Sequence, residues 1–257
     1  MLKAFVEFNS KLNYNIYLLG LKISREVLEK FLPGQFLKIK INKRLDPLIP
    51  RPFTVHAIEK DILIIMYQVV GKGTKALTKI QKGEEIEFLG PLGNPFPDIN
   101  KDYIICAGGI GIAGFGYFLQ KRVKENKKLP KKILYGAKTA EDLVRLSFFK
   151  TFGIPLELST EDGTKGYKGY ITDILEKEFK NEPCTVLACG SLPMMKKVTE
   201  IGEKYQVDVY LVMTSFLACG TGFCKGCVIP LRNKKYAYLC KDGVTFLAKE
   251  IDLESLC

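Results

Sequence analysis

Polar and apolar residues alternate in short runs through the first 95 residues of the chain. The run Lys38-Ile39-Lys40-Ile41 has the two-residue period of a strand with one buried face. Turn-forming pairs at Pro33-Gly34, Asp46-Pro47 and Lys82-Gly83 separate such runs. We therefore expect an antiparallel β-barrel or sandwich. Its six strands are expected at residues 2–8, 14–21, 35–41, 51–58, 62–70 and 85–89.

The pattern changes after residue 96. Compact apolar runs now alternate with longer segments that carry apolar residues at helical spacing. This alternation predicts an α/β domain with a doubly wound parallel sheet. Its strands are expected at 102–107, 132–137, 155–160, 184–189 and 207–213. One helix is expected to end near residue 124, and three others are expected at 140–148, 171–179 and 193–205.

Two further features divide the chain. The segment Gly90-Pro91-Leu92-Gly93-Asn94-Pro95 interrupts regular structure between the two patterns. The residues after 212 lack the alternation of strands and helices, and they carry a group of cysteines. The sequence therefore predicts three domains, at 1–95, 96–212 and 213–257.

The cysteines of the last segment have an informative spacing. Four residues separate Cys219 from Cys224, two separate Cys224 from Cys227, and Cys240 follows after twelve more. This is the plant-type spacing of a [2Fe–2S] cluster, in which each of two bridged irons takes two thiolates. Glycines such as Gly222 let the loop bend and bring N–H groups toward the sulfurs. We expect these four cysteines to hold a cluster that carries single electrons.

Two other uses of these cysteines stay open. Zinc sites usually show two short Cys-x-x-Cys pairs, whereas only Cys224 and Cys227 form one here. Disulfides need an oxidising compartment. Glu7 stands where an export signal needs an apolar core, so we expect no such signal. The spacing favours iron–sulfur over both alternatives.

Small residues follow the first strand of the α/β domain. The run Gly108-Gly109-Ile110-Gly111-Ile112-Ala113-Gly114 lets a phosphate approach the backbone at the carboxyl end of a parallel strand. It is not a G-x-G-x-x-G fingerprint, and tight packing of a strand on a helix also explains it. Cys189-Gly190 ends a second strand and Asp162-Gly163 follows a third. We expect these turns to line one crevice, although a buried cysteine and a surface turn are the simpler alternatives.

Two segments of the first domain have the chemistry to hold a flavin nucleotide. In Arg51-Pro52-Phe53-Thr54 the arginine can bind a diphosphate, and the hydroxyl can hydrogen-bond a flavin ring. The run Val69-Val70-Gly71-Lys72-Gly73-Thr74 can offer backbone N–H groups to the same diphosphate. Either alone is equally an ordinary turn. His56 is the only histidine, and without a Ser/His/Asp set we expect a satisfied surface or strand residue.

The chain is basic, with a formal net charge of +11. Residues 121–132 hold seven Lys or Arg and one Glu without interleaved aromatic residues, so a solvated surface is favoured over a nucleic-acid site. The uncharged segment 103–119 contains five glycines and only reaches the lower length limit of a membrane span. We expect a cytoplasmic protein with neither membrane nor nucleic acid as a partner.

Together the motifs resemble one superfamily. Arg-Pro-Phe-Thr, Gly-Lys-Gly-Thr, Gly-Gly-Ile-Gly-Ile-Ala, Cys-Gly-Ser and Cys-x4-Cys-x2-Cys…Cys follow one another as in the ferredoxin–NADP reductases. Within that superfamily, essentially the whole chain is similar to the electron-transfer subunits of NAD-dependent dihydroorotate dehydrogenase B, including the run Cys240-Lys-Asp242-Gly243-Val-Thr-Phe246. Gly114 departs from the pattern, because relatives often have proline there.

The resemblance implies three cofactors. It implies an FAD between the barrel and the α/β domain, with Arg51 and Gly71–Thr74 at its diphosphate and Thr54 near its isoalloxazine. NAD would dock over Gly108–Gly111 with its nicotinamide near Cys189 and Gly190, which places Cys189 and Thr54 beside the reacting rings. The [2Fe–2S] cluster would lie on the four cysteines. The complete set of expected cofactor contacts is Arg51, Pro52, Phe53, Thr54, Val69, Gly71, Lys72, Gly73, Thr74, Gly108, Gly109, Ile110, Gly111, Asp162, Gly163 and Gly190.

The resemblance also implies a partner. In that family a separate chain carries FMN in a (β/α)₈ barrel and oxidises dihydroorotate for pyrimidine biosynthesis. Electrons pass from FMN through the cluster to FAD and then to NAD, and the implied assembly is a heterotetramer of two plus two chains.

Two alternative functions stay open. One is the flavin and iron–sulfur subunit of a ferredoxin:NADP oxidoreductase, a sulfide dehydrogenase or a hydrogenase. Those subunits tend to replace the first cluster cysteine with aspartate, so Cys219 favours the dihydroorotate complex. A more remote alternative is a zinc-stabilised nucleic-acid-binding module, which leaves the two nucleotide-type domains unexplained.

Overall fold

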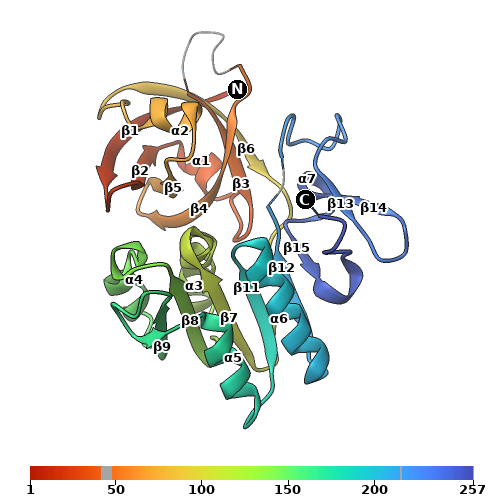
Figure 1. The fold of residues 1–257 in the computed structure, drawn as a ribbon. Helices are drawn as coiled ribbons and strands as arrows, with labels where there is room; N and C mark the ends of the chain where they lie inside the picture. The colour runs from red at the N-terminus through yellow and green to blue at the C-terminus, as the bar shows by residue number, and fades with distance from the viewer. Residues whose placement is uncertain (42–47, 215, 257) are drawn as a thin grey trace.

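The computed structural model describes residues 1–41, 48–214 and 216–256, so the expected Asp46-Pro47 turn lies outside the described residues. The chain forms a closed barrel, a seven-stranded sheet with helices, and a C-terminal segment with a two-stranded hairpin (Figure 1). The fold class is the one that the hydrophobic pattern and the resemblance predict.

The N-terminal barrel is antiparallel, with strand order β1-β2-β5-β4-β3-β6. Successive side chains of a strand point to opposite faces, and Leu19, Leu37 and Ile65 are fully buried in the core of the barrel. The strands that carry them, β2, β3 and β5, are largely buried on the other face as well. All six predicted strands are present, and the two short helices were not predicted. The elements are β1 (Leu2–Lys11), β2 (Ile16–Lys22), α1 (Arg25–Leu28), β3 (Phe36–Lys40), β4 (Arg51–Glu59), β5 (Ile62–Gln68), α2 (Lys72–Leu77) and β6 (Glu85–Leu92).

The sheet of the second part has the order β10-β9-β8-β7-β11-β12-β15. The central run β9-β8-β7-β11-β12 is parallel and reverses its direction of winding between β7 and β11. Ligands of doubly wound sheets bind at such a reversal, outside the carboxyl ends of the strands. The strands are β7 (Tyr103–Gly108), β8 (Lys132–Ala137), β9 (Leu156–Thr160), β10 (Tyr167–Lys168), β11 (Thr185–Cys189), β12 (Val209–Val212) and β15 (Thr245–Leu247).

Helices connect these strands. The predicted helix at 140–148 is wrong as a single helix. It is divided into η2 (Ala140–Asp142) and α4 (Leu146–Lys150), because Leu143 leaves the helical dihedral range and Arg145 has a φ of 61°. The other helical elements are η1 (Gly109–Gly114), α3 (Phe115–Lys124), α5 (Ile171–Phe179) and α6 (Leu192–Lys204).

The C-terminal segment leaves the sheet and returns to it. β15 pairs antiparallel with β12, so residues 245–247 complete the sheet of the α/β part. One buried core fills the barrel, and another runs from Leu18 on the barrel through the sheet to Cys227 and Ile229 in this segment. Within the described ranges, no helix combines the length and apolarity needed to cross a membrane. The remaining elements are β13 (Val228–Pro230), β14 (Tyr236–Tyr238), α7 (Leu239–Asp242) and η3 (Ala248–Glu250).

Candidate functional site

The predicted nicotinamide residues meet where the sheet reverses its winding. β7 and β11 are neighbours, and Cys189 pairs with Ala107 directly before Gly108. A Cβ atom on Gly111 would lie 2.5 Å from the carbonyl oxygen of Cys189 and 3.1 Å from its sulfur. Only glycine therefore allows the turn after β7 to approach the end of β11 so closely.

The same turn has one filled side and one open side. A Cβ atom on Gly190 would lie 2.4 Å from the sulfur of Met194, and one on Gly108 would lie 2.5 Å from it, so α6 covers both glycines. A Cβ atom on Gly109 would meet no atom within 4 Å. The open side is where a dinucleotide has access to the backbone. Met194 was missed by the sequence analysis, because a methionine in an amphipathic helix is normally a core residue.

The Cys189 thiol is protonated in this setting. Burial raises its pKa to about 12, so the group is neutral at physiological pH. A neutral, polarisable sulfur of this kind acts as a packing surface rather than as an acid or a base.

Thr54 connects the barrel to this turn. A Cβ atom on Gly114 would lie 3.2 Å from Cγ2 of Thr54 and 3.6 Å from the ring of Phe96. Gly114 has a φ of −69°, which any residue adopts, so what the glycine supplies here is room for Thr54. The predicted flavin residue of the first domain therefore lies against the predicted nucleotide turn of the second.

His56 follows two residues later on β4 and is fully buried. Its Nδ1 lies 2.8 Å from the carbonyl oxygen of Ala113, and its Nε2 accepts a hydrogen bond from Nε of Arg145 at 3.3 Å. Burial lowers the pKa of His56 to about 4; the hydrogen bond to Ala113 opposes this, and the Arg145 charge adds to it. A neutral ring with its proton on Nδ1 satisfies both partners. The prediction of a satisfied strand residue holds, but the bridge between the two domains was not foreseen.

The predicted diphosphate residues also lie together. A Cβ atom on Gly73 would lie 3.0 Å from Nε of Arg51, so the guanidinium rests against the first turn of α2. The Thr74 hydroxyl accepts the N–H groups of Val70 at 2.9 Å and of Gly71 at 3.2 Å. These two donors of the predicted loop are therefore engaged within the motif itself. The Val69 N–H donates to Asn15.

The other expected contacts are distributed around this centre. Pro52 and Phe53 pair with Lys38 and Leu37 of β3, and Phe53 is buried. Asp162 and Gly163 follow β9, two strands away from β7 along the same sheet edge. The Asp162 carboxylate accepts hydrogen bonds from the hydroxyl of Thr164 at 2.7 Å and its N–H at 3.0 Å, and these lower its pKa.

The four cysteines predicted to hold a cluster lie on or beside a glycine-rich loop. The sulfur of Cys219 accepts the N–H groups of Thr221 and Cys224, each at 3.4 Å. Gly222 donates to the sulfur of Cys240 at 3.1 Å. Cys227 and Cys240 are buried, with their sulfurs 3.3 Å apart.

These hydrogen bonds act on the thiols. Those from Thr221 and Cys224 lower the pKa of Cys219 to about 5, while burial raises that of Cys240 to about 11. A set of four sulfurs supplied with amide donors fits the ligand chemistry of an iron–sulfur cluster. Within the described ranges, no three His, Cys, Asp or Glu side chains converge on a position for a single metal ion.

The basic segment 121–132 is largely paired with carboxylates. Arg122 is buried and binds Asp98 at 3.0 Å, and Lys127 binds the same carboxylate at 3.1 Å. Lys132 binds Glu178 at 2.8 Å. Carboxylates therefore compensate much of the positive charge of this segment, as expected for a solvated surface.

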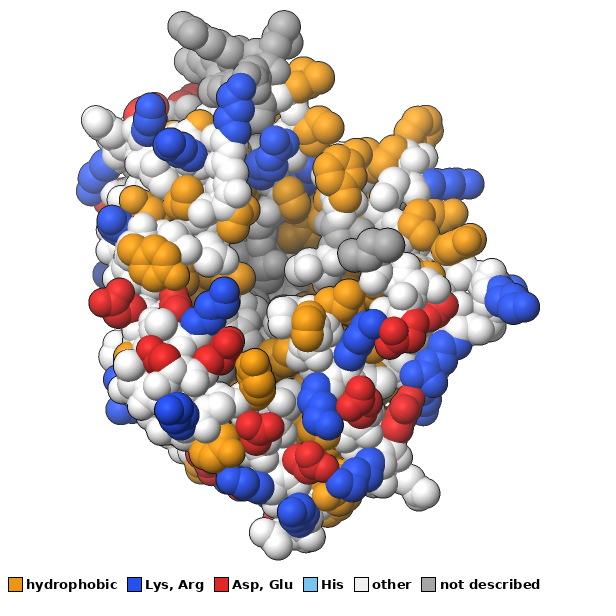
Figure 2. Space-filling model, in the orientation of Figure 1, with side chains coloured by type: hydrophobic (Ala, Val, Ile, Leu, Met, Phe, Trp, Pro, Cys, Tyr) orange, Lys and Arg blue, Asp and Glu red, His pale blue; other side chains and the backbone are white. Residues whose placement is uncertain are grey.

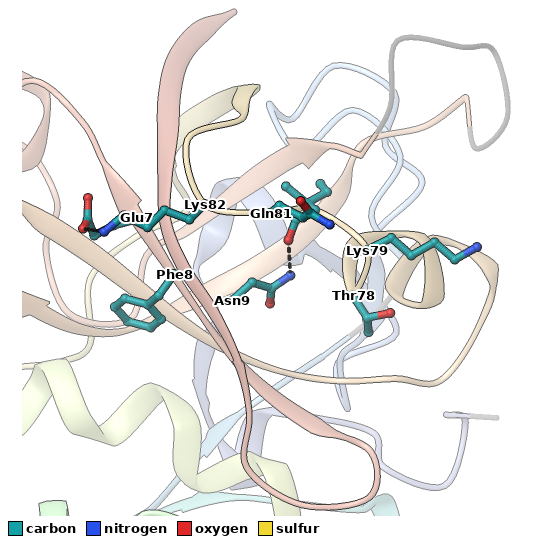
Figure 3. Close-up of a pocket in the computed structure, with 8 residues that line it drawn as sticks. Glu7, Phe8, Asn9, Thr78, Lys79, Gln81 and Lys82 are labelled. Atoms are coloured by element: carbon teal, nitrogen blue, oxygen red, sulfur yellow. Dashed lines mark hydrogen bonds and ion pairs between the residues drawn. The ribbon is translucent and has the colours of Figure 1, made fainter.

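A hollow of about 590 Å³ lies on the barrel away from these residues (Figure 3). Its lining consists of Glu7, Phe8, Asn9 and residues 78–82, none of which was predicted to bind a cofactor. Asn9 donates to the carbonyl oxygens of Leu77 at 2.9 Å and Ile80 at 3.0 Å, so its amide fastens the segment after α2 to β1.

Comparison with known families identifies two segments. The iron-sulfur cluster binding domain of dihydroorotate dehydrogenase B matches residues 214–252. The oxidoreductase NAD-binding domain matches residues 105–200. The first match contains all four cysteines, and the second contains the turns after β7 and β11.

Curated relatives match almost the full chain. A dihydroorotate dehydrogenase B (NAD(+)) electron transfer subunit homolog of Aquifex aeolicus is 35% identical over 98% of this chain and 98% of its own. The electron transfer subunit of Clostridium acetobutylicum is 36% identical over 95% of this chain and 94% of its own.

Solved structures agree in fold. The structure of an NADH-dependent reduced ferredoxin-NADP oxidoreductase has a TM-score of 0.87 and 27% identity, covering 98% of this chain and 91% of that chain. A ferredoxin NADP+ reductase from Neisseria gonorrhoeae with bound FAD and NADP shares the fold, with a TM-score of 0.66 and 16% identity over 81% of this chain and 97% of its own.

Proposed function

Because the chain belongs to the family of dihydroorotate dehydrogenase B (NAD(+)) electron transfer subunits, we propose that it takes electrons from a catalytic partner and delivers them to NAD+. One observation above all supports this. Thr54 on the barrel contacts the turn after β7, and the cysteine loop packs through Gly220 on Phe36 and Leu92 of the same barrel. A flavin on this barrel would lie between a nicotinamide site and a cluster.

The residues around each cofactor have distinct tasks. Bound FAD and a [2Fe–2S] cluster would supply the exchange between single electrons and a hydride. Arg51, beside Gly73, holds the flavin diphosphate, and Thr54 orients the isoalloxazine toward the turn after β7. Gly109 admits the NAD diphosphate on the open side of that turn. Cys189 excludes water beside the nicotinamide without exchanging a proton.

The partner is proposed to be a catalytic chain with FMN in a (β/α)₈ barrel, in an assembly of two plus two chains. The cysteine segment carries a suitable contact surface. Phe223, inside the cluster loop, is 92% exposed, and Phe216 and Tyr236 are 70% and 64% exposed. Figure 2 shows hydrophobic side chains gathered over this segment at the upper right. Exposed aromatic residues of this kind are enriched at protein interfaces.

We propose that the three parts act as units with boundaries at 1–95, 96–212 and 213–257, and that the protein works in the cytoplasm. The first part would bind FAD, the second NAD and the third the cluster. β15 extends the sheet of the second part from within the third, so these units are functional rather than separate folding units.

The experiment is anaerobic purification of the full chain, followed by its visible spectrum and assays of iron, zinc and flavin. About two irons and one FAD per chain would support the proposal. A colourless chain with one zinc and no flavin would refute it. Adding the FMN-containing partner should then produce dihydroorotate-dependent reduction of NAD+.

A second function is supported by the structural match over 98% of the chain. It is the flavin and iron–sulfur subunit of an NADH-dependent reduced ferredoxin-NADP oxidoreductase. The same purified chain distinguishes the two. Under the first function, dihydroorotate reduces the reconstituted complex; under the second, reduced ferredoxin does and dihydroorotate does not.

A further inference from the structure

Lys38 is a buried lysine on β3, with only 2% of its surface exposed. Lysine is rarely buried to this degree unless its charge is compensated. Its Nζ donates a hydrogen bond to the carbonyl oxygen of Ala218, which lies 180 positions away in the sequence and directly precedes Cys219. The barrel therefore holds the start of the cysteine loop through this side chain.

The loop is shaped around the stem of the lysine. A Cβ atom on Gly220 would lie 2.8 Å from Cδ of Lys38 and 3.3 Å from Leu92. Gly220 also has a φ of 78°, which side-chain-bearing residues rarely adopt. Both constraints keep the loop in contact with the lysine.

The cysteine loop favours the charged form of this lysine. Burial lowers the pKa of Lys38 and the Arg51 charge adds to this, whereas the interactions with Cys219, Cys224 and Cys240 oppose it. Within the barrel wall, Lys38 pairs with Pro52 of the neighbouring strand β4, next to Arg51. Lys38 thus connects the strand that carries the predicted flavin motif with the start of the cysteine loop.

We propose that the Lys38 ammonium is the counter-charge of the cysteine loop: it positions the loop on the barrel and raises the reduction potential of the cluster held there. This inference rests on the proposed iron–sulfur function. One added electron makes the four-thiolate site more negative by one charge, with no bond formed or broken. A fixed cation in a poorly solvated position stabilises that added charge.

Lys40 provides a matched control. It lies two residues further along β3, on the same side of the strand, and pairs with Glu87 at 2.6 Å near the surface. Removing its charge changes the net charge of the chain as much as removing that of Lys38. Solvent and the carboxylate screen it from the loop.

The test uses the full chain, purified anaerobically, with the variants K38M, K38Q, K38R and K40M. Iron content, the visible spectrum and the midpoint potential of the cluster are measured on each. We expect K38M and K38Q to shift the one-electron equilibrium at least tenfold toward the oxidised form, which is about 59 mV more negative. K38R and K40M should stay close to the wild type.

The other outcomes also decide. Wild-type potentials in K38M and K38Q overturn the proposal. If both neutral variants lose iron while K38R retains it, the positive charge is needed to hold the thiolates, and the proposal stands. If K38R loses iron as well, the loop needs the shape of lysine rather than its charge, and the proposal falls. A wild-type chain without iron refutes the proposed function, and this inference with it.

Discussion

The barrel meets the rest of the chain through two contact surfaces with different chemistry. Toward the α/β part, the central contacts are buried hydrogen bonds to backbone carbonyls: His56 bonds Ala113, and the Tyr117 hydroxyl donates to the carbonyl oxygen of Phe31 at 2.8 Å. The Arg145 guanidinium also donates to His56, at 3.3 Å. Toward the cysteine segment, a buried ammonium and thiols dominate, and the Asn94 amide donates to Lys241 at 3.0 Å.

This difference follows from what each surface has to control. Hydride transfer requires two rings at a fixed separation, and neutral hydrogen bonds within a packed core fix distances without adding a field. Electron transfer to a cluster is governed by the energy of an added charge, which a nearby cation changes directly. Under the proposed function, the surface toward the α/β part would set geometry, and the surface toward the cysteine segment would set electrostatics.

The largest effect is expected from a substitution in the cysteine segment. Cys240→Ser removes a buried sulfur that lies 3.3 Å from that of Cys227, so the cluster loses a ligand. We expect the iron content to fall from about two per chain to near zero while flavin is retained. Metal analysis and the visible spectrum measure this. Cys184→Ser, at the start of β11, is the control, and an unchanged spectrum in Cys240→Ser would place the fourth ligand elsewhere.

The next effect concerns the contact between the barrel and the α/β part. The pKa of His56 is about 4 in the fold against 6.5 as its ordinary value, so the unfolded chain binds the proton more readily between these pH values. The fold is therefore stabilised fully above about pH 6.5, and it loses up to about 3 kcal/mol as the pH falls to about 4. His56→Phe should remove this dependence and cost about 1–3 kcal/mol at pH 7.

Urea unfolding of both proteins across this pH range measures the effect. The stability difference between wild type and His56→Phe should narrow as the pH falls. Parallel curves would mean that the histidine does not stay neutral in the fold.

A third prediction concerns Arg51, which is proposed to bind the FAD diphosphate. Arg51→Ala removes the guanidinium beside Gly73, and charge-assisted hydrogen bonds of this kind contribute about 1.5–3 kcal/mol. FAD should bind about 10- to 100-fold more weakly, while iron is retained. Flavin fluorescence gives the dissociation constant. Arg25→Ala, which removes an exposed arginine paired with Glu29, should bind FAD normally. Full flavin occupancy in Arg51→Ala would exclude that role.

The smallest effect is expected at the edge of the contact between the barrel and the α/β part. The Tyr14 hydroxyl donates to Asp142 at 2.9 Å, but the pair is exposed. Tyr14→Phe should therefore cost about 0.5 kcal/mol, near the lower limit for a hydrogen bond. A loss as large as that of His56→Phe would show that the edge carries the contact.

Local patterns predicted most of the fold and the grouping of the site. Alternation gave the six barrel strands, and the position of Gly108 and Cys189 at strand ends placed them together, because neighbouring parallel strands end at one edge. The spacing of the four cysteines alone predicts that they share one role. These features depend on residues that are close in the sequence or on a regular sheet.

Contacts between distant segments were not predictable. His56 was assigned to a strand, but its partners Ala113 and Arg145 come from other elements. Lys38 fits the polar side of an alternating strand, and only the fold shows that the cysteine loop covers it. The break in the helix at 140–148 has a similar origin, since Arg145 leaves the helical range where its side chain bonds His56.

The pairing of β15 with β12 has a consequence for the history of this architecture. Thr245 pairs with Val212, and the N–H of Met213 donates to Val244 at 2.7 Å, so the cysteine segment starts and ends at the same place on the sheet. In topological terms it is an insertion into a β-hairpin. Such an insertion can be gained, lost or exchanged without rethreading the remaining chain. A flavin reductase can thus gain or lose a cluster-binding segment as a single module.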